Sequence, residues 1–461
     1  MNFFSCIFSA KRALGKMPAQ GPLPEDRDIL RQTMRIALPA SVESFLVALC
    51  AFVDQRMVSF ISPSAIAAVG LTSEPRMLAL AFFTGLGIGV SAIVARRKGE
   101  GDSAKANFVL RASLVIALIV TVLFSVGGVL FADEIIRFAG SAEDTHAGAV
   151  SYYRIVMACL GFNSFSLVIN AAQRGAGNTK LAMKANLTCN AVNLLADWLL
   201  IPRYGVEGAA WGLVMGTAVG FIISASSLFA KSSYLRLAEK AQVEDRAAVL
   251  RPLWNIGRST VLEQMILRGG FFLFAKVMAG LGTEAFTAHR IGMNVLNISF
   301  SFGDGLAAAS VALVGMALGE KRRDLARIYG TFCQRIGLLV AGALALSYVF
   351  FGRGIVGLLA RSASVADTAR NLLYIMTVLI ILQITQLVYS GCLRGCGDAK
   401  FCTRLSLISF GVLRPGLAWL AVNPLNLGIY GAWACLIIDQ IVRVVVTYRR
   451  FYGEKWAKIE V

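Results

Sequence analysis

The sequence predicts an all-α integral membrane protein with twelve transmembrane helices. They form two six-helix bundles related by a pseudo-twofold axis along the membrane normal. Apolar residues make up 57% of the 461 positions, charged residues only 16%, and the mean hydropathy is +0.66; a soluble domain carries about 25% charged residues. Many apolar runs are long enough to cross a hydrocarbon core, which takes about 20 residues each. The second half of the chain also repeats the first.

The predicted helices follow the apolar runs along the chain. These runs lack a period-2 alternation, which disfavours strands. Each half holds six spans, so the two repeats cross the membrane in the same direction. The expected spans are 36–61, 65–95, 108–131, 147–170, 182–202, 206–230, 255–279, 286–317, 328–351, 371–392, 403–422 and 428–448.

The internal repeat has an offset of 220 residues over most of its length and 223 near the end of each half. Two like lobes joined end to end are a known way to build a transporter, with the substrate path between them. The matches are Arg174-Gly175-x-Gly177-x-x-Lys180 with Arg394-Gly395-x-Gly397-x-x-Lys400, Gly85-Leu86 with Gly305-Leu306, Glu43 with Glu263, and Gly205-x-x-Gly208-Ala209 with Gly428-x-x-Gly431-Ala432.

Basic residues predict the orientation. Most of the 45 Lys and Arg lie in alternate connectors and near the two ends of the chain, which is the pattern of cytoplasmic loops. We therefore expect a multi-pass protein of the plasma (inner) membrane with both termini in the cytoplasm. The expected domains are a cytoplasmic N-terminal segment (1–35), an N-lobe (36–230), a cytoplasmic linker (231–254), a C-lobe (255–448) and a cytoplasmic tail (449–461).

The net charge of +18 does not indicate a nucleic-acid partner, because the basic residues line loops that face anionic membrane lipids. The nine cysteines are scattered and do not form a metal-binding pattern. The sequence contains no nucleotide-binding loop, no metal-ligand spacing and no nucleophile–base set. We therefore expect no enzyme activity, no cofactor and no metal, and ATP is not the direct energy source.

Polar residues at membrane depth are the best candidates for a functional site. A carboxylate there costs about 2.5–3.5 kcal/mol on insertion scales, so it normally faces a cavity or a partner. Asp54 and Asp197 lie at similar depths in the outer halves of their spans, and Asn193 shares a helix face with Asp197 as an i, i+4 pair. Thr217 has a comparable depth. We interpret these four residues as a site for a proton or a cation, against the alternative that each one braces neighbouring helices.

This acidic-amide set exists in the first lobe only. Its repeat partners in the second lobe are apolar: Phe274 for Asp54, Leu413 for Asn193 and Leu417 for Asp197.

The same residues carry a resemblance to the multidrug and toxic compound extrusion (MATE) transporters, over about residues 30–450. The resemblance implies twelve helices in two bundles around a V-shaped cavity. It also implies export of amphipathic, often cationic organic compounds against an inward flow of protons or sodium. The matching motifs are Pro39 through Phe52-Val53-Asp54 to Ala67-Ala68-Val69-Gly70, Gly85-Leu86-Gly87, Gly99-Glu100-Gly101-Asp102, Arg174-Gly175-Ala176-Gly177-Asn178-Thr179-Lys180, Ala288-His289-Arg290-Ile291 and Leu393-Arg394-Gly395-Cys396-Gly397-Asp398.

Within that family, the spacing of the proline, the two acids and the amide resembles the DinF-like branch. This resemblance implies that Asp54, Asn193 and Asp197 form the coupling site and that the first span bends at Pro39, whose ring permits a kink. It also implies that Asn170 lines the same cavity, although its depth places it nearer the cytoplasmic end. Another branch couples through carboxylates in the second lobe, where this chain has Gln383.

The other charged residues at membrane depth have competing interpretations. Glu43 and Glu263 are repeat mates that either form part of an inner gate or pair with arginine or backbone groups. Asp304, between two glycines, is a candidate cation or substrate contact in the second lobe. Asp439 and Arg443 are spaced as a structural i, i+4 pair.

Three functions fit these observations. The first is a monomeric exporter of small organic compounds, coupled to H⁺ or Na⁺. The second is a lipid-linked oligosaccharide flippase of the same superfamily, which would need a cavity rich in basic residues; those expected at membrane depth are few, namely Arg56, Arg268, Lys276 and Arg414. The third is a non-transporting receptor or scaffold, which would not need buried carboxylates. The first interpretation accounts for the acids at membrane depth.

Overall fold

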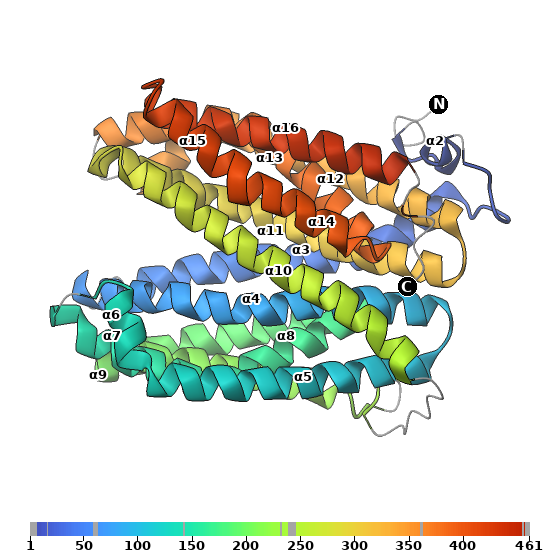
Figure 1. Ribbon diagram of the computed structural model, residues 1–461, viewed down its shortest axis with the longest axis horizontal. Coiled ribbons are helices and arrows are strands. Elements are labelled where there is room, and N and C mark those ends of the chain that lie inside the picture. Colours follow the sequence, from blue (N-terminus) through green and yellow to red (C-terminus); the bar gives the residue numbers. More distant parts are fainter. Residues whose placement is uncertain are drawn as a thin grey trace. The chain divides into compact units, whose positions relative to one another are not determined.

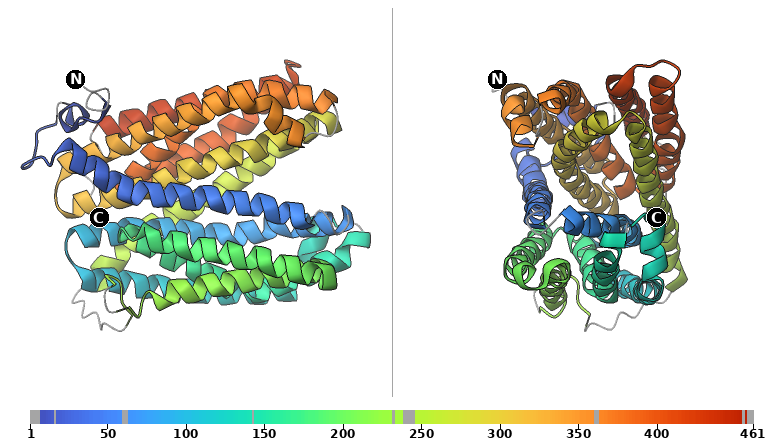
Figure 2. Two further views of the ribbon diagram at one scale, coloured as in Figure 1. Left: turned by 180° about the vertical axis from the view of Figure 1, so that it is seen from behind. Right: turned by 90° about the vertical axis from the view of Figure 1, so that its left-hand side faces the viewer.

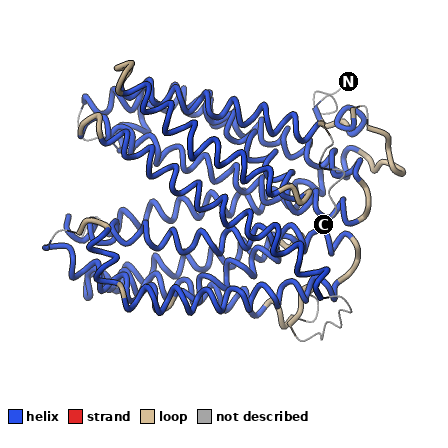
Figure 3. Tube along the Cα trace, viewed as in Figure 1, coloured by secondary structure: helices blue, strands red, loops and turns tan. Residues whose placement is uncertain are grey.

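The computed structural model describes residues 7–15, 17–58, 63–141, 143–230, 233–237, 246–359, 363–453 and 456. Within these ranges the elements are helices joined by short connections, and no strand occurs (Figure 3). This confirms the predicted all-α class. The helices, labelled in Figure 1, are α2 (Ala10–Leu14), α3 (Asp26–Val58), α4 (Pro63–Gly99), α5 (Ser103–Leu130), α6 (Ala132–Phe138), α7 (Glu143–Ala158), α8 (Leu160–Gly175), α9 (Thr179–Ser226), α10 (Arg246–Ala279), α11 (Thr283–Gly319), α12 (Arg323–Leu359), α13 (Ala363–Gly395), α14 (Ala399–Ser406), η1 (Leu407–Leu413), α15 (Arg414–Val422) and α16 (Gly428–Tyr452).

The described residues contain the twelve spans that the sequence predicts. Nine helices are long and apolar enough to cross a membrane, and α7 with α8 form a tenth span, bent by 49°. One of the nine, α9, counts as two spans, because its backbone is non-helical at Gly205 (φ 54°, ψ −126°). The remaining span is α10, whose charged side chains lower its hydropathy.

Most helices extend beyond their apolar runs. For example, α10 begins at Arg246 instead of 255, and α5 begins at Ser103 instead of 108. Hydropathy marks the part of a helix that lies in hydrocarbon, whereas capping decides where the helix begins. At α5 the cap is Asp102, whose Oδ1 accepts a hydrogen bond from the backbone N–H of Lys105 at 2.9 Å.

Two irregular spans were not predicted. The fourth span bends at Cys159, between α7 and α8. The eleventh contains a π-helical segment, η1, which ends two residues before Pro415 of α15. Proline has no N–H to donate and its ring crowds the preceding turn, and the wider π-helix accommodates that defect. Such π segments are frequent at functional sites.

The helices divide into two compact units. The C-terminal unit comprises Met1–Phe45 with Leu262–Val461, and the N-terminal unit comprises Leu46–Val261. Helices α3 and α10 therefore each contribute to both units. In the N-terminal unit α4 contacts α5, α7 and α8, and α8 packs along α9 (Figure 2). In the C-terminal unit α13 contacts α11, α12 and α16.

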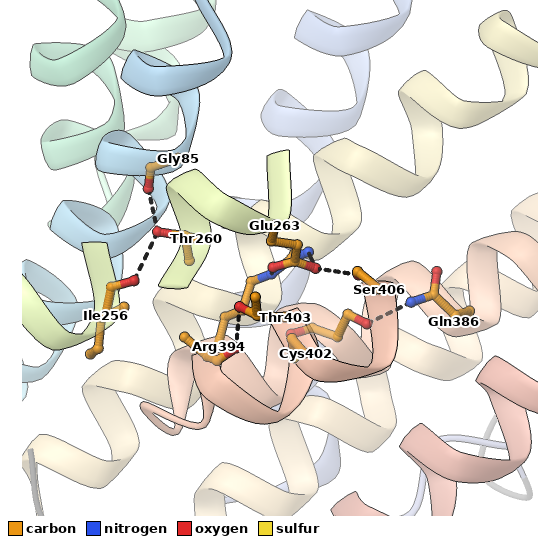
Figure 4. Close-up of polar contacts among 11 residues, drawn as sticks. Gly85, Ile256, Thr260, Glu263, Gln386, Arg394, Cys402, Thr403 and Ser406 are labelled. Carbon is orange, nitrogen blue, oxygen red and sulfur yellow. Dashed lines mark hydrogen bonds and ion pairs between the residues drawn. The ribbon is translucent and has the colours of Figure 1, made fainter. Parts of the chain in front are cut away.

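In each unit a glycine allows a very close helix crossing. In the C-terminal unit a Cβ on Gly305 would lie 2.5 Å from the Cα of Ser41. In the N-terminal unit a Cβ on Gly85 would lie 2.4 Å from the Cα of Val261, and Thr260 Oγ1 donates to the Gly85 carbonyl at 2.6 Å (Figure 4). Gly85 and Gly305 are repeat mates, and so are Ser41 and Val261. The same glycine-mediated helix crossing therefore occurs once in each unit, at equivalent positions of the repeat.

We expect Gly85→Ala and Gly305→Ala each to destabilise the protein by about 1–3 kcal/mol, the usual range for overpacking. The opposing atoms belong to a helix backbone, which cannot rotate away as a side chain can. Thermal unfolding of the purified protein measures the effect. Gly70→Ala in α4 and Gly342→Ala in α12 are matched controls, because a Cβ at either position meets no atom within 4 Å. Equal melting temperatures for all four variants would contradict the close crossing.

The repeated arginine-glycine motif has a similar packing role. A Cβ on Gly175 would lie 2.4 Å from the carbonyl oxygen of Ser91, and one on Gly395 would lie 2.8 Å from that of Val311. Ser91 and Val311 are themselves repeat mates. These glycines therefore let α8 approach α4, and α13 approach α11, at backbone distance.

Part of the linker lies against the N-terminal unit. In residues 233–237 the backbone N–H of Arg236 donates to Asn107 Oδ1 at 2.8 Å. Burial raises the pKa of the Tyr234 phenol to about 12, and the nearby negative charge of Asp102 adds to the shift. This phenol therefore stays protonated at physiological pH, and Arg111 adds a hydrogen bond from its guanidinium to the carbonyl oxygen of Leu237.

Candidate functional site

The predicted amide–acid pair forms in the N-terminal unit. Asn193 Nδ2 donates a hydrogen bond to Asp197 Oδ2 at 3.0 Å. Asp197 has no exposed surface, and Asn193 is 7% exposed. The two residues lie one turn apart in the first half of α9 (179–204), as their i, i+4 spacing predicts. The sequence thus correctly predicts that these two side chains touch.

A stripe of glycines lies opposite this pair in the second half of α9 (206–226). A Cβ on Gly212 would lie only 1.9 Å from Asp197 Oδ1, and one on Gly216 would lie 2.8 Å from the Cβ of Asn193. The whole stripe recurs every fourth residue and consists of Gly208, Gly212, Gly216 and Gly220. Small residues at this spacing let membrane helices approach closely. The sequence analysis missed this stripe, although its period is visible in the sequence.

The turn between the two halves of α9 brings the pair and the stripe together. Pro202 and Gly205 lie within it, and the positive φ of Gly205 (54°) suits glycine better than any other residue. Immediately after the turn, a Cβ on Gly208 would lie 2.4 Å from the carbonyl oxygen of Leu200. The chain therefore reverses direction tightly, and the carboxylate of Asp197 lies against the backbone of the returning helix.

We expect Gly212→Ala to displace the Asp197 carboxylate and break its hydrogen bond with Asn193, because no side chain fits at 1.9 Å. Overpacking of this kind costs about 1–3 kcal/mol, and gradient-driven transport should fall together with stability. Thermal unfolding and transport assays measure the two effects. Gly127→Ala in α5 is the control, since a Cβ there meets nothing within 4 Å. A variant with wild-type stability and transport would contradict the close approach.

The structure holds Thr217 and Asn170 in other contacts. Thr217 Oγ1 donates to the carbonyl oxygens of Leu213 and Val214 in its own helix, at 3.0 Å each. Asn170 in α8 is 2% exposed, and its Oδ1 accepts a hydrogen bond from Ser224 at 2.9 Å. Ser224 lies about 18 Å along the helix from Gly212, at 1.5 Å per residue. Asn170 is therefore not in the same cluster as Asp197, in agreement with its shallower predicted depth.

Two further candidates belong to α3. The side chain of Asp54 lies outside the part of the chain that the structure describes, so its predicted place in the coupling site stays a prediction. Pro39 is half-buried within α3, which continues on both sides of the proline. It lies two residues before Ser41, where α3 crosses Gly305.

In the C-terminal unit Glu263 is held by an arginine. Arg394 Nη2 lies 2.7 Å from Glu263 Oε1, and Ser406 donates to the same oxygen at 3.0 Å (Figure 4). Glu263 is 1% exposed. Its contacts match the arginine pairing that the sequence analysis offered as the alternative to an inner gate. Its repeat mate Glu43 in α3 is also buried, at 5% exposed.

Asp304 lies near the same arginine. It is exposed on α11, and the positive charges of Arg394 and Arg268 act on its carboxylate. The charges of both Glu263 and Asp304, which the sequence analysis considered separately, thus act on Arg394.

The predicted pairing of Asp439 with Arg443 is wrong in its partner. Asp439 accepts from Arg414 Nη2 at 2.7 Å and from the Ser409 hydroxyl. The guanidinium of Arg443 instead lies over the ring of Phe410, 4.7 Å from its centroid. Pairing across helices prevails because Ser409 lies within the π segment η1 and Arg414 follows directly after it, so that both side chains reach Asp439 in α16.

Two further basic side chains, Arg394 and Arg443, are buried inside α13 and α16, at 9% and 5% exposed. No group of three His, Cys, Asp or Glu side chains that could hold a metal occurs within the described ranges.

Comparison with known proteins places both halves of the chain in one family. A sequence model of the family described as MatE matches residues 39–199 and again residues 260–420. The same model thus matches twice, once in each half, which confirms the internal duplication.

Individual relatives cover nearly the whole chain. A protein of Thermotoga maritima named "Probable multidrug resistance protein NorM" is 24% identical over 447 residues, 95% of each chain. "Multidrug resistance protein NorM" of Vibrio cholerae is 26% identical over 442 residues, covering 91% of this chain and 94% of the relative. A solved structure described as the outward-facing conformation of a multidrug resistance MATE family transporter has a TM-score of 0.87 at 23% identity, covering 94% of this chain and 100% of that one. The helices and the two matched halves together establish that this chain belongs to the MATE family of multi-pass membrane transporters.

Proposed function

We propose that this protein is a secondary active transporter that exports amphipathic, often cationic organic compounds by antiport with protons or sodium, within the DinF-like branch of its family. The observation that carries the proposal is the fully buried Asp197, hydrogen-bonded to Asn193 against a glycine-lined helix. A carboxylate inside a membrane protein marks an ion pathway by default, because its burial is costly.

The partners of the buried acids support this assignment. Glu263 and Asp439 each form an ion pair with an arginine at 2.7 Å. Asp197 accepts a hydrogen bond from the Asn193 amide. Its carboxylate also touches the returning half of α9, so that a change of charge acts directly on helix packing.

The remaining candidates complete the proposal. Asp54 supplies a second carboxylate, and Thr217 lies one position after Gly216, which faces Asn193. Pro39 permits α3 to bend next to its crossing with Gly305. Bending of this helix would alternate access between the lobes, with Glu43 and Glu263 on the cytoplasmic side.

The named relatives favour export of drugs over the flippase alternative. They are called multidrug resistance proteins, and Arg394 and Arg414 are already bound to carboxylates and not available to a pyrophosphate. We further propose that the protein acts as a monomer in the plasma (inner) membrane, surrounded by lipid, with both termini in the cytoplasm.

The test is efflux of a fluorescent organic cation from proteoliposomes, with a pH gradient or a sodium gradient imposed separately. We expect one of the two gradients to accelerate efflux, and that gradient identifies the coupling ion. Collapsing the same gradient with an ionophore is the control. Wild-type transport that ignores both gradients would contradict antiport, and transport of a labelled lipid-linked oligosaccharide in its place would favour the flippase.

A further inference from the structure

Helix α11 has a polar face that the proposed coupling site does not use. Among the residues of α11 that the structure describes, every exposed side chain is polar. They follow one another at steps of three or four, apart from one longer step that contains the partly exposed Ser301, so they share one face of the helix. The exposed residues are Glu284, Thr287, Arg290, Asn294, Asn297 and Asp304.

The exposed face of α5 has the opposite character. Every exposed side chain in α5 is apolar, and two examples are Ile119 and Leu123, which are 63% and 67% exposed. An apolar face of this kind suits contact with lipid. Polar side chains at membrane depth normally face the protein interior or water instead. The polar face of α11 therefore indicates a border with water.

This polar face ends at Asp304, close to the middle of the membrane. Asp304 lies within three residues of the middle of the apolar run 286–317, and Arg268 lies one residue from the middle of the run 255–279. At about 1.5 Å per residue, both lie within about 5 Å of the centre of their spans. Both side chains are exposed. Charged side chains at this depth mark substrate or ion pathways, and transporters bind their substrates near the midplane.

An aromatic contact brings the two charged residues into the same region. Phe271, one turn after Arg268, packs edge-to-face on Phe300, one turn before Asp304, with ring centroids 6.3 Å apart. The positive charge of Arg268 acts on the Asp304 carboxylate, but no described residue donates a hydrogen bond to that carboxylate. The surrounding protein partly desolvates the carboxylate, which is nevertheless accessible. Two opposite charges thus lie near each other without forming a direct ion pair.

The other arginine that acts on Asp304 is already engaged. Arg394 is 9% exposed and forms an ion pair with the buried Glu263 at 2.7 Å. The accessible charged groups at this depth of α10 and α11 are therefore one guanidinium, Arg268, and one carboxylate, Asp304.

We propose that Arg268 and Asp304 bind small organic zwitterions, compounds that carry both a cationic group and a carboxylate, and that the polar face of α11 leads to them. Arg268 binds the carboxylate of the ligand, since a guanidinium fits a carboxylate with two parallel hydrogen bonds. Asp304 binds the cationic group. A ligand with a cation alone would leave the Arg268 charge unanswered beside it. This inference rests on the proposed transport function and narrows its substrate.

The test compares two fluorescent probes that differ in one charge. Rhodamine B carries an organic cation and a free carboxylate, whereas its ethyl ester carries the cation alone. Equilibrium binding to the purified full-length protein is measured by fluorescence polarisation. We expect the wild type to bind rhodamine B about tenfold more tightly than the ester, since one hydrogen-bonded charge contact is added. Arg268→Gln should remove this preference, Arg268→Lys should keep part of it, and Asp304→Asn should weaken the binding of both probes.

The matched control is Lys276→Gln. Lys276 is also an exposed cation of α10, but it lies about 12 Å further along the helix, at 1.5 Å per residue. This variant should keep the wild-type preference. A wild type that binds the ester as tightly as rhodamine B would overturn the proposal, and so would an unchanged preference in Arg268→Gln or an equal loss in Lys276→Gln. Thermal unfolding shows whether each variant is folded.

The aqueous border of α11 is tested separately with a charged, membrane-impermeant thiol reagent. We expect Asn297→Cys in α11 to react and Ile119→Cys in α5 not to react, beyond the background of the wild-type cysteines. An unreactive Asn297→Cys would overturn the polar path. None of these measurements uses an ion gradient. A wild type that exports the ester under a gradient but shows no preference for rhodamine B would keep the proposed function and overturn this inference.

Discussion

Asp197→Asn is expected to abolish the gradient-driven part of transport while leaving the protein folded. Asparagine has nearly the shape of aspartate but cannot change its charge, so a proton or sodium ion no longer shifts the balance between conformations. The coupling free energy between two binding sites is typically about 1–3 kcal/mol, or about 5–150-fold in affinity. We expect the factor by which the gradient accelerates efflux to fall by a similar amount. The measurement is efflux of a fluorescent organic cation from proteoliposomes with and without the gradient.

The control is Asp133→Asn, an acid of the same unit outside the membrane spans. A hydrogen bond from His146 lowers the pKa of Asp133, so this carboxylate is already ionised at neutral pH. Because its folded pKa is depressed, its contribution to stability is present above the unfolded carboxyl pKa and is lost only as the pH falls through the folded pKa. A pH or sodium gradient imposed near neutral pH should therefore drive transport by this variant as it does by the wild type. Persisting gradient stimulation in Asp197→Asn would move the coupling site elsewhere, and Asp304 would be the next residue to replace.

The sequence could predict the Asn193–Asp197 contact, because that contact depends on the geometry of a single helix. Asn193 and Asp197 are one turn apart in any α-helix, and hydropathy places that helix in the membrane because a bilayer requires long apolar runs. The approach of Gly212 to within 1.9 Å of the carboxylate depends on how two helices pack. That packing follows from the turn at Gly205 and from the glycine period, and not from either helix alone.

The second lobe shows why comparing the repeats was misleading. Leu417 is the repeat mate of Asp197, and on that comparison the acidic-amide set exists in the first lobe only. The structure places the acid on the other helix: Asp439 in α16 is the mate of Gly216 at the offset of 223. A residue-by-residue comparison detects a lost side chain. It does not detect the same chemistry transferred to a facing helix, and it also misses the π segment that brings Arg414 to Asp439.

The largest effect on stability is expected from Arg394→Met. This change leaves the Glu263 carboxylate buried, with the Ser406 hydroxyl as its other described contact. Removing one partner of a buried ion pair costs about 3–5 kcal/mol, because the other charge stays in a low-dielectric interior. Thermal or chemical unfolding of the purified protein measures the loss. Arg370→Met is the matched control. Its ion pair with Asp367, at 3.1 Å, is far more exposed, and pairs of that kind contribute about 0–1 kcal/mol.

The double variant Glu263→Gln with Arg394→Met decides between the two interpretations of Glu263. If the pair is structural, removing both charges should recover much of the stability that Arg394→Met loses, since a buried ion pair replaced as a whole is often close to neutral. Transport should then follow stability in all three variants. If Glu263 is instead part of an inner gate, Glu263→Gln should impair transport even where the protein is as stable as the wild type. The geometry favours the first result, because Arg394 and Ser406 both bind one oxygen of Glu263 within 3.0 Å, and a group that opens and closes a gate must be able to leave its partners.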